Sequence, residues 1–408
     1  MSFYGWRIVW AFAISTTAAY GVLYYSFAVF VQPMEQELGW NRAQTSLAFS
    51  LSALVGGLVA PLLGRWLDRY GARAISSLGA GAASLLLLGW SYTSSLEVLY
   101  ALWFLLGVCT AATFYDAAFT TIAVWFKQQR TEAMLTITLV AGLSSTIFVP
   151  LDTLLLEIFD WRGAIRVLAL LMFLTAPLIW LVVRHHPSDV GSTVDGLPIK
   201  NAVQTPQIAP VVEFWRARAF WSVALAFALG RVAVSVLAPH LVPLLRERGY
   251  SSAFAATAAG AVGVLQLFGR VMFSSFIKRV RLVLLSSVTF LLHGLGVLFL
   301  TFQTDWGVWG FALFYGATNG AITLTRAALL GELFAPNVYG RVNGTVSLLV
   351  SLSSAFAPFV AGLLHNQFGD YQVVLWGIVA ALLVSSGLVL NVHAKSTKPE
   401  PNLHNPEK

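Results

Sequence analysis

The composition of the chain sets the first limits on what it can be. It has 408 residues, of which 57% are apolar and 11% are charged, and its formal net charge is +7. Soluble domains carry about 25% charged residues, so this composition excludes a soluble globular protein and predicts an integral protein of the lipid bilayer. The single cysteine, Cys109, excludes an intrachain disulfide and a cysteine-based metal site.

Sequence motifs of enzyme chemistry are missing. The chain has no phosphate-binding glycine loop, no H-E-x-x-H helix and no G-x-S-x-G turn. We therefore expect no enzyme activity, no cofactor and no metal.

Apolar runs long enough to cross a membrane recur along the whole chain. A helical span needs about 20 residues to cross roughly 30 Å of hydrocarbon, and these runs lack the two-residue alternation of barrel strands. The sequence predicts an all-α membrane protein of twelve transmembrane helices in two six-helix bundles. The predicted spans lie near Val9–Pro33, Thr45–Leu63, Ala74–Thr93, Val98–Val124, Ala133–Leu156, Ala164–Val183, Phe220–Leu245, Ala253–Ile277, Leu282–Thr301, Val308–Leu333, Val342–Leu364 and Val373–Val392.

One long polar interval divides the spans into two blocks of six. The predicted parts are an N-terminal bundle at 1–183, a central loop at 184–218, a C-terminal bundle at 219–393 and a disordered tail at 394–408. With both termini in the cytosol, the segments on that side carry 17 Lys and Arg residues and the opposite segments carry 5. Basic residues favour the cytosolic side. The bias predicts a multi-pass protein of the plasma (inner) membrane with cytosolic termini, and it needs no nucleic acid partner.

A charged loop with the pattern G-x-x-x-D-R-x-G-x-R follows the second span, at Gly64, Asp68, Arg69, Gly71 and Arg73. A weak copy, S-S-F-I-K-R-V-R, follows the eighth span. Together with the twelve spans, this gate motif resembles that of the major facilitator superfamily of transporters, in which two helix bundles form a parallel repeat. The resemblance implies that Asp68 meets the cytosolic N-terminus of helix 11, where the helix dipole favours a negative charge, and helps to close that side. A tight turn with solvated charges is the alternative.

Other residues resemble those of the monocarboxylate transporters and their bacterial relatives. They are Tyr4-Gly5-Trp6, Trp125-Phe126 with Arg130 and Ala133, and Arg270 in helix 8. The resemblance implies that Arg270 binds a substrate carboxylate. The acid expected four residues earlier is replaced by Gln266, and the lysine expected in helix 1 by Tyr25, so the usual proton-coupling groups are changed. Helix 11 has no lysine or arginine between Val342 and Leu364, which argues against an oxalate–formate type exchanger.

Four ionisable residues fall well inside the predicted spans, namely Asp116, Arg231, Arg270 and Arg326. Since each would cost roughly 2.5–3.5 kcal/mol on insertion scales, together they oppose insertion by about 10–14 kcal/mol before any pairing. Such a cost is tolerable only where the groups face one another or a water-filled cavity. Three of them lie on helices 4, 7 and 10, which line the cavity in the superfamily.

These charges define the predicted binding site. Arg270 and Arg231 are expected to hold an anionic carboxylate, because a guanidinium group matches its two oxygens; pairing within the protein is the alternative. Arg326 is a further candidate, although it lies nearer the cytosol and could extend its charge to the membrane surface. Asp116 is the candidate proton-coupling residue, or else a gate with Arg270 or Arg326, or a permanently paired structural acid.

Helices 1 and 10 supply candidates for the cavity wall. Tyr24 and Tyr25 on helix 1 and Asn319 on helix 10 are predicted to contact substrate, with ordinary packing as the alternative. Asp152, which follows Pro150 in helix 5, is interpreted as a structural acid near the outer mouth.

The sequence thus predicts a secondary active transporter of small organic anions, with proton-coupled monocarboxylate transport by alternating access. Its partners would be a small anionic substrate and protons, and a monomer is expected. A proton-driven exporter of drugs or amphipathic metabolites is the alternative. The presence of three arginines and one centred acid in the membrane disfavours it. A non-transporting membrane sensor is a second alternative, and it leaves the gate motif unexplained.

Overall fold

The computed structural model describes residues 3–196, 214–277 and 279–392. Within these ranges the chain is almost wholly helical and has no strand. Eleven helical stretches there are long and apolar enough to cross a membrane. A further helix, α13 (Asp305–Leu333), has 29 residues and carries the polar Asn319 and Arg326. The predicted all-α membrane fold is confirmed.

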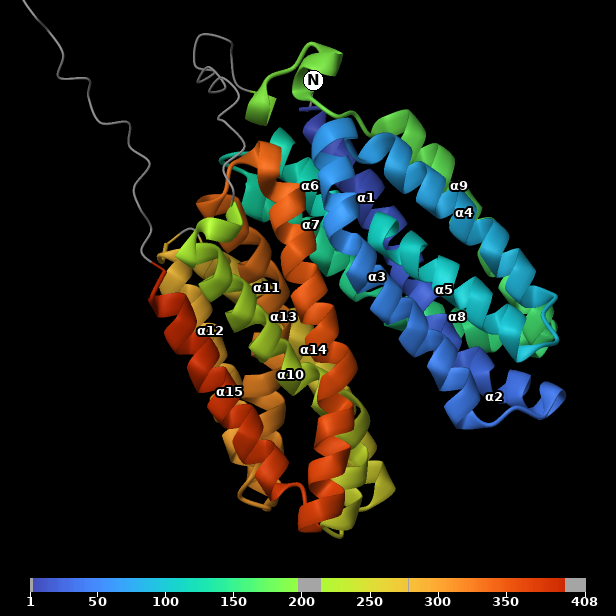
Figure 1. Cartoon of the computed structure of the whole chain (residues 1–408), viewed down its shortest axis with the longest axis vertical. Coiled ribbons are helices and arrows are strands. Elements are labelled where there is room, and N and C mark those ends of the chain that lie inside the picture. Colours follow the sequence, from blue (N-terminus) through green and yellow to red (C-terminus); the bar gives the residue numbers. More distant parts are fainter. Residues whose placement is uncertain (1–2, 197–213, 278, 393–408) are drawn as a thin grey trace, which may run out of the picture.

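The first half of the described chain forms six helical rods of alternating direction. We call the end at which α1 begins the linker end, and the end at which α2 stops the far end (Figure 1). The elements are α1 (Gly5–Tyr20), η1 (Gly21–Tyr25), α2 (Ser26–Leu38), α3 (Arg42–Tyr70), α4 (Ala72–Ser91), α5 (Leu96–Thr113), α6 (Tyr115–Trp125), α7 (Arg130–Gly142), α8 (Ser144–Ile158) and α9 (Trp161–Val182).

The second half adds six more rods, which also alternate in direction. Besides α13 they are α10 (Arg218–Glu247), α11 (Ser252–Ile277), α12 (Leu282–Leu300), α14 (Tyr339–Phe368) and α15 (Gln372–Leu390). Short 3₁₀ turns lie between helices at η2 (Pro187–Val190), η3 (Val194–Gly196), η5 (Phe214–Arg216) and η6 (Pro336–Val338).

The two halves meet mainly along α3 and α14, with a second contact between α7 and α11. Figure 1 shows them close together at the linker end and diverging towards the far end. Glycines permit the close approach of α3 and α14, because a Cβ atom on Gly344 would lie 2.3 Å from the Ala60 carbonyl oxygen. Small residues of this kind are the usual means by which membrane helices pack tightly.

Three of the spans predicted as continuous helices are interrupted. Within the first, η1 is a π-helical turn, and the Ser26 hydroxyl donates to the Gly21 carbonyl oxygen at 2.9 Å. Phe114, with ψ of −167°, separates α5 from α6, and Leu143 separates α7 from α8. An apolar run fits a straight or an interrupted helix equally well, so periodicity could not reveal these breaks. Such irregular turns are frequent at functional sites.

The described part of the predicted central loop is held against the first half. The Asp195 carboxylate accepts hydrogen bonds from the backbone N–H groups of Lys127 and Gln128, at 3.0 and 2.8 Å. These two residues form the turn between α6 and α7. Residues 197–213 of the predicted loop and the predicted tail at 394–408 lie outside the described residues.

Candidate functional site

The Asp68 carboxylate joins the two halves at the linker end. One oxygen accepts from the Gly340 backbone N–H at 2.7 Å, and the other accepts from the backbone N–H and Nε of Arg341 at 2.9 and 3.3 Å. Both residues lie in the first turn of α14, where backbone N–H groups have no partner within the helix and the helix dipole favours an anion. The contact therefore satisfies a helix N-terminus with a charge from the opposite half.

The two glycines of the gate motif have different uses. A Cβ atom on Gly64 would lie 2.1 Å from the Gly340 carbonyl oxygen, so the backbones of α3 and α14 touch there. Gly71 has a φ of +73°, which L side chains rarely adopt, and it turns the chain from α3 into α4.

The His185 ring packs against Gly71. Burial lowers the pKa of His185, and His186 has a smaller effect in the same direction.

The two arginines of the gate motif contact the first half. The Arg69 guanidinium lies 5.3 Å from the centre of the Tyr70 ring. Arg73 donates from Nε to the Trp180 carbonyl oxygen at 2.8 Å and covers the Trp180 ring. In the described contacts, Gly64 and Asp68 are the members of the motif that reach the second half.

A second junction between the halves is centred on Asp116. Its carboxylate oxygen Oδ1 accepts from the Asn343 side-chain amide at 2.8 Å and lies 3.5 Å from Nη2 of Arg326. The cluster joins α6 of the first half to α13 and α14 of the second. Of the two partners expected for Asp116, the structure brings it to Arg326 rather than Arg270.

Arg270 crosses from the second half into the first. Its side chain is buried, with 5% exposed, and Nη1 donates to the Thr138 carbonyl oxygen of α7. The guanidinium lies so close to Gly142 that a Cβ atom there would be 2.2 Å from Nη1. Its Nε has no hydrogen-bond partner within the described part of the chain. The α7–α8 break thus lies beside a guanidinium that retains an unused donor.

The other predicted binding residues lie around this position in two groups. Arg231 donates from Nε to the Ser354 hydroxyl at 3.3 Å, and Asn319 donates to the Gln266 side chain at 3.3 Å. Gln266, which stands where the monocarboxylate transporters carry an acid in helix 8, is thus paired with an amide from helix 10.

Tyr24 and Tyr25 owe their positions to the π-helical turn. Tyr24 is 43% exposed and its ring stands edge-on to Tyr25, with centroids 5.1 Å apart. Tyr24 also meets the Tyr20 ring, which stacks on Phe114 at 4.0 Å. The aromatic group therefore links the irregular turn of the first rod to the break between α5 and α6.

The predicted site residues do not form one cluster. Arg270 contacts the Thr138 carbonyl oxygen and Arg231 the Ser354 hydroxyl, whereas Arg326 is engaged with Asp116. We did not predict from the sequence that Asp116 would bind Asn343, that Arg270 would bind the Thr138 carbonyl oxygen, or that Arg231 would bind Ser354. A backbone carbonyl such as that of Thr138 has no signal in a sequence, and a single serine or asparagine in an apolar helix is a weak one.

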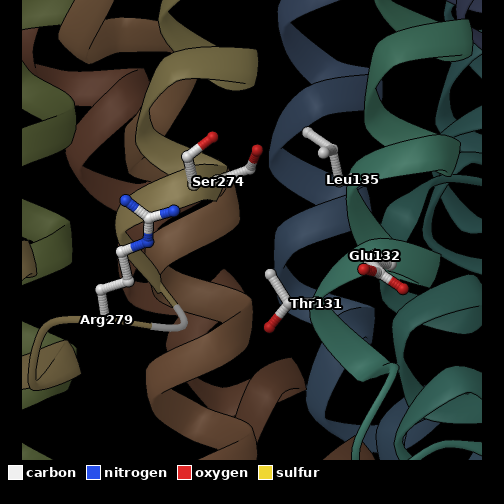
Figure 2. A pocket seen from close by; sticks show the side chains of 6 residues that line it. Thr131, Glu132, Leu135, Ser274 and Arg279 are labelled. Atoms are coloured by element: carbon white, nitrogen blue, oxygen red, sulfur yellow. The ribbon is translucent and has the colours of Figure 1, made fainter.

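A pocket of about 310 Å³ lies between α7 and α11 at the linker end, and no predicted binding residue lines it. Figure 2 shows Glu132 and Thr131 on one side and Arg279 and Ser274 on the other. The pocket is completed by Leu135 and Ser275. Its two walls belong to opposite halves, so it lies where any relative motion of the halves would change its width.

Comparison with known proteins decides the family. A profile described as the Major Facilitator Superfamily matches residues 9–325 and 281–408. The chain belongs to the major facilitator superfamily. It is a membrane transporter and not an enzyme, and the family predicted from the gate motif is confirmed.

Two curated proteins place this superfamily member more narrowly. Human monocarboxylate transporter 11 is 26% identical over 405 residues, which cover 95% of this chain and 81% of that protein. The uncharacterised MFS-type transporter YcxA of Bacillus subtilis is 25% identical over 386 residues, covering 89% and 88%. The resemblance to the monocarboxylate transporters and their bacterial relatives is therefore confirmed at low identity.

A solved structure agrees with the superfamily fold. The proton:xylose symporter XylE superposes with a TM-score of 0.75 at 13% identity, covering 94% of each chain. At this identity the likeness shows the fold, two bundles of six helices, and carries no information on substrate.

Proposed function

We propose that this superfamily member is a secondary active transporter of small organic anions, most simply monocarboxylates, coupled to protons. Arg270 carries the proposal. It is a buried cation with an unused Nε donor, and it lies at the junction of the two halves. A buried guanidinium needs an anionic or hydrogen-bonding partner, and a carboxylate can supply both. The similarity to monocarboxylate transporters supports the same substrate class.

The proposed cycle uses the contacts that Arg270 makes. With the linker end closed, Arg270 holds the Thr138 carbonyl oxygen across the halves. A bound carboxylate would occupy the free face of the guanidinium, with Arg231 as a second cation and Tyr24, Tyr25 and Asn319 around it. Rocking of the halves would then have to break the Arg270–Thr138 contact, so occupation of Arg270 and movement of the halves are linked.

Asp116 is the proposed proton-coupling residue. Ionised, its carboxylate holds Arg326 and Asn343 at the junction of α6, α13 and α14. Protonation would remove the charge that attracts Arg326 and would weaken the junction. A proton on Asp116 would therefore favour separation of the halves at the linker end.

The proposed setting is the plasma (inner) membrane, with a single copy of the chain as the working unit and the linker end in the cytosol. The excess of Lys and Arg in the segments predicted on the cytosolic side supports this orientation. The closed linker end would then be the cytosolic side, and the diverging far end would face outwards.

Uptake into proteoliposomes tests the function. Labelled lactate or pyruvate should accumulate when the inside is made alkaline, and Arg270→Ala should raise the KM about 10- to 100-fold, since a hydrogen bond to a charged group contributes about 1.5–3 kcal/mol. Arg281→Ala, which removes an exposed arginine at the start of α12, is the matched control. Unchanged uptake by Arg270→Ala would remove Arg270 from the site. Failure with every monocarboxylate would favour the exporter alternative.

A further inference from the structure

Asp152 is an acid that the proposed cycle has not used. It lies in α8, six residues before the far end of that helix, and its side chain is completely buried. Neither of its carboxylate oxygens has a hydrogen-bond partner within the described part of the chain. A structural acid normally holds a hydrogen-bond or charge partner, which gives a reason to ask whether Asp152 also binds a proton.

The surroundings of Asp152 are apolar. The helix packs against η1, α2 and α9 and more weakly against α1 and α7, and the buried residues of this region include Phe148, Leu155, Val22 and Leu23. The Ser26 hydroxyl is the polar side chain that acts on the Asp152 carboxyl group, and no charged side chain does. The titratable and charged groups on the helices concerned are Arg7, Tyr20, Tyr24, Tyr25, Glu35, Glu37, Arg130, Glu132, Glu157, Arg162 and Arg166.

Ser26 distinguishes the two protonation states. Its hydroxyl donates to the Gly21 carbonyl oxygen at 2.9 Å, so it could turn to an ionised Asp152 only by giving up that hydrogen bond. Its oxygen still has a lone pair that could accept from a protonated carboxyl group. Burying an ionised carboxylate without a donor or a cation costs several kcal/mol, whereas the neutral acid costs much less. This environment therefore suits Asp152 with its proton bound.

The position of Asp152 connects that proton to the predicted substrate wall. Ser26, the residue beside it, terminates the π-helical turn η1, and the neighbouring Phe148 ring packs directly against Gly21. The same turn carries Tyr24 and Tyr25. A negative charge on Asp152 would require water or a donor to enter between α8 and η1, and η1 would have to move to admit it.

We propose that Asp152 is a second proton-binding site, distinct from Asp116, and that its proton accompanies the anion through the transport cycle. The proton passes from hydronium in the water at the far end to one carboxylate oxygen, which neutralises the residue and lets α8 close on η1. The proton is released to water as hydronium when η1 moves. The coupling to the anion rests on the proposed function; the proton-binding itself does not.

Infrared difference spectroscopy tests the proton-binding directly. Purified wild-type protein in lipid should show the C=O stretching band of a protonated carboxylic acid at neutral pH, shifted by exchange into deuterium oxide. Asp152→Asn should lose that band. Glu157→Gln, which removes an exposed acid five residues along the same helix, and Asp116→Asn should keep it. If Asp152→Asn does not fold, Asp152→Glu should retain a carboxylic acid band at a shifted frequency. A band that persists in Asp152→Asn overturns the proposal.

Transport separates the two claims. An imposed gradient of one pH unit should give about tenfold accumulation of the anion by the wild type if one net proton is coupled. Asp152→Asn should accumulate the anion about tenfold less than the wild type, because one coupled proton is lost, yet should still exchange internal for external anion, because Arg270 is intact. Accumulation by Asp152→Asn equal to that of the wild type would overturn its coupling role. A wild type that ignores the gradient would overturn the proposed function, and the infrared band would still decide whether Asp152 binds a proton.

Discussion

A single acid can hold two halves of a transporter together only while it is ionised, and Asp116 is placed to act in this way. Its partners approach from α13 and α14, and the Arg326 side chain is 13% exposed. Removing one member of this partly buried ion pair is unfavourable, because the other charge is left without compensation. The balance between the closed and open linker end therefore depends on the charge at this position.

At this residue scale we expect Asp116→Asn to flatten the pH profile of uptake. The neutral amide keeps the shape of the side chain but imitates the protonated acid at every pH, so lowering the pH can no longer weaken the Arg326 contact. Initial rates of uptake, measured between acidic and neutral external pH, check this.

Asn343→Ala is the matched control, since it removes one hydrogen bond to Asp116 and leaves the ion pair to Arg326 intact. We expect it to keep the pH dependence of the wild type. A profile of Asp116→Asn identical to that of the wild type would reject the coupling role of Asp116.

Among the helices, α3 and α14 decide how closely the halves can approach. Their contact has backbone atoms on both sides at Gly64 and Gly340, and the Asp68 carboxylate closes the same turn from α3. A methyl group introduced there meets backbone, which cannot rotate away as a side chain could. The closed linker end therefore tolerates no side chain at this crossing.

At the element scale we expect Gly64→Ala to open the linker end. Its Cβ atom would lie 2.1 Å from the Gly340 carbonyl oxygen, so α3 and α14 must separate. In a Cys109→Ala background, a reporter cysteine at the buried Val342 of α14 should react several-fold faster with a water-soluble thiol reagent when Gly64→Ala is present.

Gly81→Ala in α4 is the control, because a Cβ atom there meets nothing within 4 Å. We expect it to leave the labelling rate of the Val342→Cys reporter unchanged. Equal labelling rates in Gly64→Ala and Gly81→Ala would show that the α3–α14 crossing does not set the closed state.

In the whole molecule, the side predicted to carry most of the Lys and Arg residues is also the side on which the two halves are joined. The segments predicted on the cytosolic side carry 17 of these cations, and the linker end is where Asp68, Asp116 and Arg270 join the halves. If basic residues mark the cytosolic side, the structure is closed to the cytosol.

Reporter fusions at the C-terminus test this orientation. A green fluorescent protein fusion should be fluorescent and an alkaline phosphatase fusion inactive, because the first matures in the cytosol and the second needs the oxidising exterior. A phosphatase fusion placed in the turn between α9 and α8, near Asp160, should be active and is the internal control. An active C-terminal phosphatase would reverse the assignment of both ends.

The sequence by itself determined the membrane setting, the helical class, the spans and the family. These follow from composition, run length and the spacing of Gly64, Asp68 and Arg73, all of which are local in the chain. It also identified Asp116 and Arg270 as charges that must find partners, since the cost of an ion in hydrocarbon does not depend on the fold.

Which partners they find was decided only by the tertiary structure. Asp116 meets Arg326 and Asn343, more than 200 residues away along the chain. Arg270 meets the backbone carbonyl of Thr138, and every residue type has such a carbonyl, so the sequence could not indicate this partner. The π-helical turn at Gly21–Tyr25 and the missing partner of Asp152 were likewise invisible, because both depend on how α8 packs on the first rod. Hydrophobic run length is a property of one segment, whereas pairing and burial are properties of several segments brought together.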